Sequence, residues 1–118
     1  MSDVNTGGRK PAPLELKPLA KPLFRLGQLL ATPAALAALD RFGVQPLDLV
    51  MGRHVVGEWG DLCEEDRELN MHSIAHGMRI FSSYKLGATT SECTSTETIF
   101  VITEADRSST TILRWDDY

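Results

Sequence analysis

The stretch "TIFVITEADRSSTTILRW", residues 98–115, decides the fold class that the sequence predicts. Its two halves, 98–105 and 110–115, are rich in β-branched and aromatic residues, which favour strands. The short polar turn "DRSS" between them is typical of a β-hairpin. Residues 99–102 are apolar on both faces, so their strand is expected at the centre of a sheet with helices covering one side. A further strand is expected in "MRIFSSYKL", residues 78–86, which makes an antiparallel meander.

Helix signals precede these strands. Thr32 is a natural N-cap and Pro33 suits the first helical position, while Gly43 is expected to end this helix. Pro46 opens a second short helix in "PLDLVMGRHV". After the glycines of "GEWG", Asp61 is expected to cap a third helix that stops at Gly77.

The sequence therefore predicts an α+β fold with about three short N-terminal helices followed by an antiparallel β-meander of three or four strands. A chain of 118 residues holds one such domain, expected over 23–118. Residues 1–22 are rich in proline and lack a helix or strand period, so they are expected to form a flexible arm with Leu14, Leu16 and Leu19 as its candidate docking residues.

The charge is unevenly distributed. The formal net charge is −4, yet residues 1–25 hold five of the 12 basic residues and only two of the 16 acidic ones. The rest of the chain is therefore acidic. Such a surface disfavours binding to duplex nucleic acid, which depends on neutralising phosphates, and suits a basic protein partner.

Several classes of protein are disfavoured. No run approaches the roughly twenty apolar residues that span a bilayer, and no signal-peptide core is present, so a cytoplasmic location without a membrane partner is expected. Cys63 and Cys93 form no CxxC pair and are expected to be reduced thiols. No phosphate-binding loop, nucleophile elbow or zinc motif appears, and no cofactor is expected.

The segment "RHVVGEWGDLCEEDRELN", residues 53–70, is the first candidate site. In a functional interpretation, His54 is an acid–base group beside a carboxylate in a cleft. In the structural interpretation that we favour, Arg53 pairs with Asp61 or Glu65, His54 bonds a backbone carbonyl and Trp59 is buried. The segment then joins two helices through a Trp-centred turn whose polar residues are held by salt bridges.

The hairpin tip is the second candidate site. Small sheet-based ribonucleases use strand-borne Arg, Glu and hydroxyl groups to hold a phosphate and to move protons. If the chain is an enzyme, His54, Glu104, Arg107 and Ser108 are the residues expected to cleave RNA without a metal. The structural interpretation is a turn in which Asp106 and Ser108 bond the backbone and Arg107 pairs with a neighbouring acid.

A metal site is the weakest candidate. Glu68, His72 and His76 recur every four residues and share a helical face, but His near a helix C-terminus is ordinary and no further ligand is signalled. We expect no metal. The two polar segments together define one candidate binding or structural cluster, which comprises Arg53, His54, Trp59, Asp61, Glu65, Asp66, Asn70, Glu104, Asp106 and Arg107.

Motifs in four places give the chain a family resemblance. They are "ATPAAL" at 31–36, "RHVVGEWGDLCEEDRELN" at 53–70, "RIFSSY" at 79–84 and "ITEADRSSTTIL" at 102–113. With them the chain resembles a family of small bacterial proteins of plasmids, integrative elements and prophages, some labelled as restriction-modification subunits. Phe100 stands where the family pattern has Trp, and His72 and His76 match no family position. The resemblance implies a mobile-element setting and no particular activity.

Three functions remain open from the sequence. The leading hypothesis is a non-catalytic accessory protein of a mobile genetic element that binds a host or element-encoded protein, with an anti-restriction or anti-CRISPR antagonist of host defence as its concrete form. The first alternative is the RNA-cleaving domain described above. The second is a structural module that forms a homodimer through its sheet.

Overall fold

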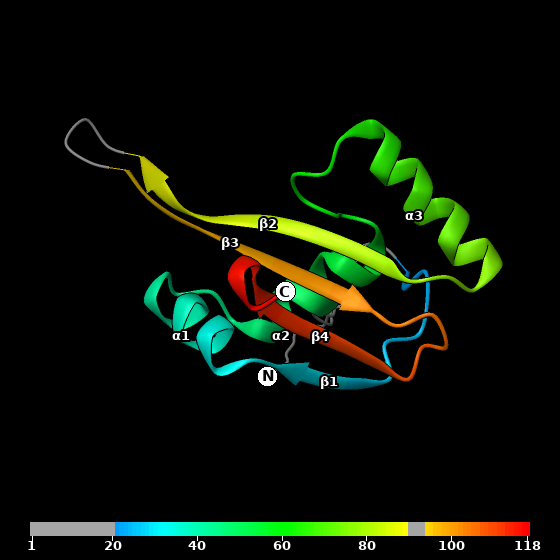
Figure 1. The fold of residues 1–118 in the computed structure, drawn as a ribbon, viewed down its shortest axis with the longest axis horizontal. Helices are drawn as coiled ribbons and strands as arrows, with labels where there is room; N and C mark the ends of the chain where they lie inside the picture. Colours follow the sequence, from blue (N-terminus) through cyan, green and yellow to red (C-terminus); the bar gives the residue numbers. More distant parts are fainter. Residues whose placement is uncertain (1–20, 90–93) are drawn as a thin grey trace, which may run out of the picture.

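The computed structural model describes residues 21–89 and 94–118. In chain order its elements are β1 (Gln28–Ala31), α1 (Pro33–Arg41), α2 (Pro46–Gly52), η1 (His54–Val56), α3 (Glu64–His76), β2 (Ile80–Thr89), β3 (Thr94–Thr103), β4 (Ser109–Arg114) and η2 (Trp115–Asp117). Three α-helices accompany one four-stranded sheet (Figure 1). The predicted α+β class is confirmed.

The sheet has the strand order β1-β4-β3-β2. Strands β2, β3 and β4 form the expected antiparallel meander with β3 in the interior, whereas β1 pairs in parallel with β4. The expectation that all helices precede the sheet is therefore wrong, because β1 comes before α1. This strand is only four residues long and its partner lies at the other end of the sequence, so it leaves almost no local pattern.

Local signals explain the two ends of α1. The Thr32 hydroxyl accepts a hydrogen bond from the Ala35 N–H at 3.1 Å, which satisfies one of the free donors of the first turn. Gly43 lies just beyond the C-cap with a φ of 70°, a conformation that glycine adopts without strain. Both assignments agree with the sequence prediction.

The start of α3 differs from the prediction. The helix begins at Glu64 after an N-cap at Cys63, and it ends as expected at Gly77. Asp61 lies two residues before this N-cap, and its N–H donates to the Ser83 carbonyl of β2 at 2.7 Å. Asp61 therefore helps to cover the edge of β2. The first turn of α3 carries Glu64, Glu65 and Asp66.

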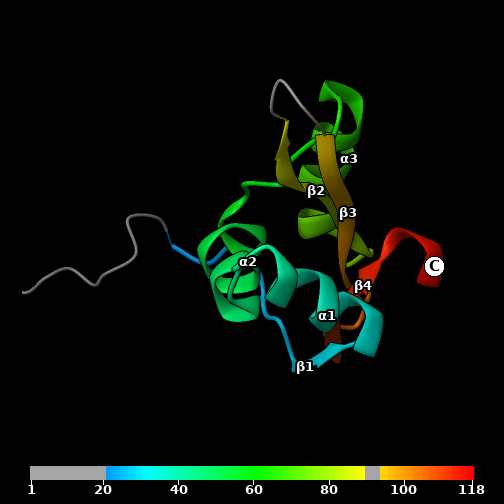
Figure 2. The same cartoon turned by 90° about the vertical axis from the view of Figure 1, so that its left-hand side faces the viewer.

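The core lies between the sheet and the first two helices. Viewed along the sheet, α1 and α2 cover one face and η2 lies against the other (Figure 2). The buried core cluster contains Ala35, Ala38, Leu39, Leu49, Val50, Tyr84, Leu86, Ile99, Val101 and Ile112. On the opposite face Phe100 packs against Phe81 and meets Tyr118 edge-on, with ring centroids 4.9 and 6.0 Å apart.

Some expectations fall beyond this description. The predicted arm, residues 1–22, lies almost wholly outside the described residues, and so does Cys93. Cys63 is an exposed thiol. Within residues 21–89 and 94–118, no helix has the length and apolar character that crossing a membrane requires.

Candidate functional site

His54 is the centre of a buried polar chain that crosses three strands. His54 is the first residue of η1, which follows α2 directly. Its ring lies beneath the sheet and is 0% exposed. Nδ1 bonds the Ser82 hydroxyl of β2, and Nε2 lies 2.9 Å from the Thr103 hydroxyl of β3. The Thr103 hydroxyl bonds Thr110 of β4 at 2.7 Å, and Thr110 donates to the Leu26 carbonyl at 2.8 Å.

The direction of these hydrogen bonds follows from the last one. Thr110 gives its only hydroxyl proton to a carbonyl, so it must accept from Thr103. Thr103 then has no proton left for His54 and accepts from Nε2–H. Nδ1 is the remaining acceptor and takes the Ser82 proton. Every member of the buried polar chain is thus satisfied by a neutral imidazole.

Burial also keeps His54 neutral. Desolvation lowers the pKa of His54 from 6.5 to about 3, because a charged imidazolium loses its hydration in this position. The ring carries no charge at neutral pH and has no path to solvent. His54 therefore lacks the two properties of an acid–base catalyst, a pKa near the working pH and contact with a substrate.

This pKa predicts an acid-sensitive fold. The unfolded chain takes up a proton on His54 below about pH 6.5, whereas the folded protein does not until about pH 3, so stability falls as the pH drops between these values. The slope from this group approaches about 1.4 kcal/mol per pH unit. Urea unfolding at pH 7, 6 and 5 measures it. The His54→Gln variant, which keeps a donor and an acceptor, is the control, and parallel profiles for the two proteins contradict the assignment.

Trp59 anchors the turn that joins η1 to α3. Its side chain is 3% exposed, and its indole N–H donates to the His54 carbonyl at 3.0 Å. The Ser83 N–H donates to the Trp59 carbonyl at 3.2 Å, so the turn lies against the outer edge of β2. Gly60 has a φ of 76°, and a Cβ there would lie 2.1 Å from the Ser83 carbonyl oxygen. The predicted burial of Trp59 is confirmed.

Asn70, on α3, also covers the outer edge of β2. Its side-chain amide donates to the Phe81 carbonyl at 2.7 Å, and its carbonyl oxygen accepts from the Phe81 N–H at 3.1 Å. Together with the bridge between Gly60 and Ser83, this side chain satisfies backbone groups of β2 that a further strand would otherwise pair. The segment 53–70 therefore serves to close one edge of the sheet.

Arg53 has a different partner from the one expected. Its guanidinium bonds Glu58 at 3.0 Å and lies 4.6 Å from the centre of the Tyr84 ring, and it pairs with neither Asp61 nor Glu65. The predicted salt bridge of Arg53 with Asp61 or Glu65 is therefore wrong. Main-chain hydrogen bonds hold the turn instead, and Arg67 adds to them by donating to the Gly60 carbonyl at 2.6 Å.

In the hairpin, Arg107 is directed towards the main chain. The Arg107 guanidinium donates to four carbonyls, those of Ser73, Met78, Glu104 and Ala105. It thereby ties the last turn of α3 to the hairpin, where a cation also favours the helix dipole. Among the described residues Arg107 pairs with no acid, contrary to the structural interpretation of the sequence.

The other hairpin groups bond locally. Glu104 pairs with Arg79 at 3.2 Å. The Ser108 N–H donates to the Asp106 carboxylate at 3.0 Å, as a turn requires. Hydrogen bonds from the Ser108 side chain and backbone lower the pKa of Asp106 below its usual value.

The structure does not assemble the proposed RNA-cleaving site. His54 is sealed beneath the sheet, Arg107 is engaged by main-chain carbonyls, and Glu104 is neutralised at the surface. The ribonuclease hypothesis therefore receives no support from the geometry.

The helical histidines stack on each other. The ring centroids of His72 and His76 are 4.0 Å apart, and His76 bonds the His72 carbonyl at 2.9 Å. In the part of the chain that the structure describes, no group of three or more His, Cys, Asp or Glu side chains is placed to hold a metal ion.

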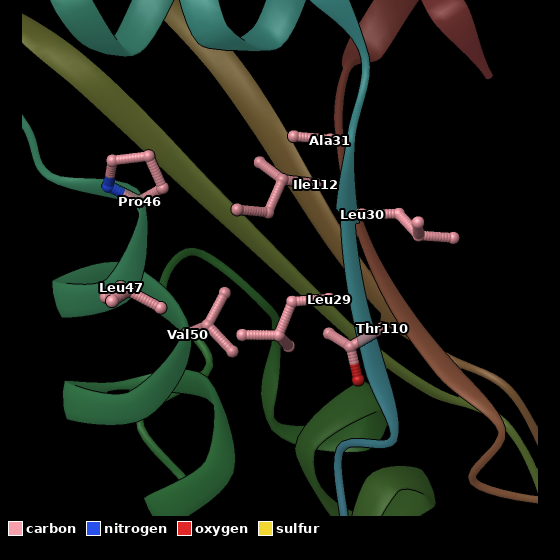
Figure 3. A pocket seen from close by; sticks show the side chains of 8 residues that line it. All are labelled: Leu29, Leu30, Ala31, Pro46, Leu47, Val50, Thr110 and Ile112. Atoms are coloured by element: carbon pink, nitrogen blue, oxygen red, sulfur yellow. The ribbon is translucent and has the colours of Figure 1, made fainter.

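An apolar groove between β1 and α2 was not anticipated from the sequence. It holds a cavity of about 150 Å³ that is lined by Leu29, Leu30, Ala31, Pro46, Leu47, Val50, Thr110 and Ile112 (Figure 3). Figure 3 shows Leu29 and Ala31 directed towards α2 and Leu30 directed away from it. The sequence signal for it is the pair of adjacent leucines at 29–30.

The groove opens at an unpaired strand edge. Gln28 and Thr32 donate to the carbonyls of Ser108 and Ile112, so in this parallel ladder the alternate residues Leu29 and Ala31 turn their N–H and C=O groups away from β4. Among the described strands none pairs with that side of β1. Within residues 21–89 and 94–118, the outer edge of β2 is covered, whereas no strand covers the outer edge of β1.

The chain was compared with family models, curated proteins and solved structures. No protein-family model, curated protein or solved structure matches the chain.

Proposed function

We propose that the chain is a small non-catalytic protein that acts by binding a protein partner, and that the groove between β1 and α2 is its binding site. One observation carries the proposal: an apolar cavity opens beside a strand edge that none of the described strands pairs with. Extended segments of partner proteins bind at such edges, where main-chain hydrogen bonds give affinity and adjacent pockets take alternate side chains.

The inward orientation of the polar residues supports a binding function. His54, Trp59, Asn70 and Arg107 all contribute to holding the fold. The surface of the groove carries Leu47 instead, which is 56% exposed although it is a large apolar side chain. Exposed apolar side chains around a cavity are typical of protein-binding sites.

The finer proposal concerns the setting. An antagonist of host defence, of the anti-restriction or anti-CRISPR type, fits the mobile-element resemblance and the acidic body. A basic partner suits the formal charge of −4, because complementary charge accelerates association. The groove itself is apolar. We therefore propose that the negative charge of the protein attracts the basic partner and that apolar contacts in the groove then bind it.

An affinity capture with matched variants tests this function. Leu47→Glu places a charge at the groove, in the first turn of α2 where the helix dipole tolerates an acid. Leu69→Glu is the control, because Leu69 on α3 is 57% exposed and lies outside the groove. A host protein retained by the wild type and by Leu69→Glu should bind Leu47→Glu at least about tenfold more weakly. Equal retention by all three proteins, or retention by none, contradicts the proposal.

A further inference from the structure

Strand β1 is an edge strand with little protection against further pairing. Protein sheets usually protect an edge with charged side chains, a proline or a bulge, or by keeping the edge strand short. In Gln28–Ala31, "QLLA", only the short length remains, because the strand contains no charge and no proline and its register with β4 is unbroken. Leu29 and Leu30 are both exposed. This edge is therefore suited to pairing with another strand.

We propose that β1 pairs in the antiparallel direction with β1 of a second copy of the chain, about a two-fold axis that passes beside Leu30. The sheets of the two copies then join into one continuous sheet. The pairing does not rest on the proposed function, although it uses the same edge. A protein partner that binds in the groove takes the place of the second copy.

The main chain of β1 fixes the register of this pairing. Leu29 and Ala31 direct their N–H and C=O groups away from β4. A two-fold axis at Leu30 places Leu29 of each copy opposite Ala31 of the other, and such opposed residues exchange two hydrogen bonds. An axis at Leu29 would instead set Ala31 against Gly27, whose φ of 67° departs from a strand conformation. An axis at Ala31 would set Leu29 against Pro33, which has no N–H.

The side chains suit the same register. Figure 3 shows Leu30 directed away from the groove, and the axis places it directly opposite Leu30 of the second copy. The Cβ atoms of such opposed residues lie about 4.5–5.5 Å apart, so the two exposed leucines cover each other. On the groove side, Ala31 of the second copy lies opposite Leu29, next to the apolar lining. Both faces of the new strand pair are therefore apolar.

The charges at the two ends of β1 are complementary. Arg25 precedes the strand by three residues and is exposed. At the other end lies the exposed carboxylate of Asp117, which accepts a hydrogen bond from the Thr32 hydroxyl at 2.7 Å. The hairpin tip beside the start of β1 adds Asp106 and Arg107, which are opposite in charge. Antiparallel pairing brings the start of each strand beside the end of the other, so Arg25 of each copy approaches Asp117 of the other.

Sedimentation equilibrium of the full chain, from about 1 µM to about 1 mM, tests the pairing. The contact is small, so the wild type should pass from monomer to dimer with a dissociation constant of roughly 1–100 µM. Leu30→Lys and Leu30→Glu should each weaken the dimer at least about tenfold, because like charges then face each other across the axis. The matched control is Leu69→Lys, which changes an equally exposed leucine on α3 and should dimerise like the wild type.

Mixing the two charged variants tests the register itself. An equimolar mixture of Leu30→Lys and Leu30→Glu should recover dimers, because Lys of one copy then faces Glu of the other. A variant that has merely lost its fold gains nothing from mixing. Ala31→Pro gives an independent test, since it removes an outward N–H and leaves the N–H groups that bond β4 in place. It should weaken the wild-type dimer at least about tenfold as well.

Three results overturn the inference. A wild type that remains monomeric up to about 1 mM shows that β1 pairs with no second copy. A dimer that persists unchanged in Leu30→Lys and Ala31→Pro forms through another surface. Charged variants that stay monomeric when mixed show that Leu30 does not face its counterpart.

The partner capture separates this inference from the proposed function. A dimer that meets these tests while no host protein is retained upholds the pairing and contradicts the binding function. A host protein that is retained by a monomeric wild type and lost with Leu47→Glu upholds the function and contradicts the pairing. If both are correct, the purified host protein should dissociate the dimer, because the two occupy the same edge.

Discussion

Replacing His54 with Ala should lower the free energy of unfolding by about 3–5 kcal/mol. The substitution removes a fully buried ring and leaves the Ser82 and Thr103 hydroxyls facing a void. Each of these groups then loses the partner that compensated for its burial. Domains of this size are stable by only about 5–15 kcal/mol, so the variant should unfold at a much lower urea concentration.

Two companion variants show whether the buried polar chain is the cause. His72→Ala removes a histidine from the exposed face of α3 and should change stability by no more than about 0.5 kcal/mol. His54→Gln restores a donor and an acceptor and should recover part of the loss. If His54→Ala and His72→Ala have equal effects on the urea midpoint, the structural role of His54 is refuted.

Trp59→Ala should cost a similar amount, about 3–5 kcal/mol. The indole is buried in the turn that covers the edge of β2, so its removal leaves a cavity in a closely packed region. Loss of the indole also removes one of the two hydrogen bonds to the His54 carbonyl, which then keeps only that of the Gly57 N–H. Thermal or urea unfolding followed by circular dichroism measures the change.

The chain contains its own control for this prediction. Trp115 in η2 is 54% exposed, so Trp115→Ala should change stability by no more than about 0.5 kcal/mol. Trp59→Phe keeps most of the apolar volume but loses the indole N–H, so part of the cost should remain, including about 1 kcal/mol for the hydrogen bond. Equal effects of the two tryptophan-to-alanine substitutions would show that Trp59 is not an anchor.

Elements with a complete local pattern could be predicted from the sequence. The hairpin of β3 and β4 combines β-branched residues on both sides of a polar turn, and α1 combines an N-cap with a proline and a terminal glycine. Strand β1 could not be predicted, because its four residues become a strand only through pairing with β4. The strand is thus created by tertiary contact rather than by propensity.

The site was predictable in part. Burial of Trp59 follows from a large aromatic residue framed by glycines in a tight turn. The partners of His54 do not, because Ser82 and Thr103 lie 28 and 49 residues further along the chain. A serine between Ile80 and Tyr84, at an inward position of an apolar strand, was the available signal. The contacts of Arg107 left no signal at all, because main-chain carbonyls are the same at every residue.

The parallel pairing of β1 with β4 also determines when the fold can form during synthesis. Gln28 pairs with Ser109, and Thr32 donates to Asp117 at 2.7 Å, so the first described strand cannot pair until residues 109–117 have been synthesised. Until β4 has been made, the apolar sides of α1 and α2 lack the strand that they cover, and a nascent chain exposes them. Such long-range pairing slows folding and makes it depend on contacts that close last. Demand for chaperones on the ribosome should therefore be highest just before β4 emerges.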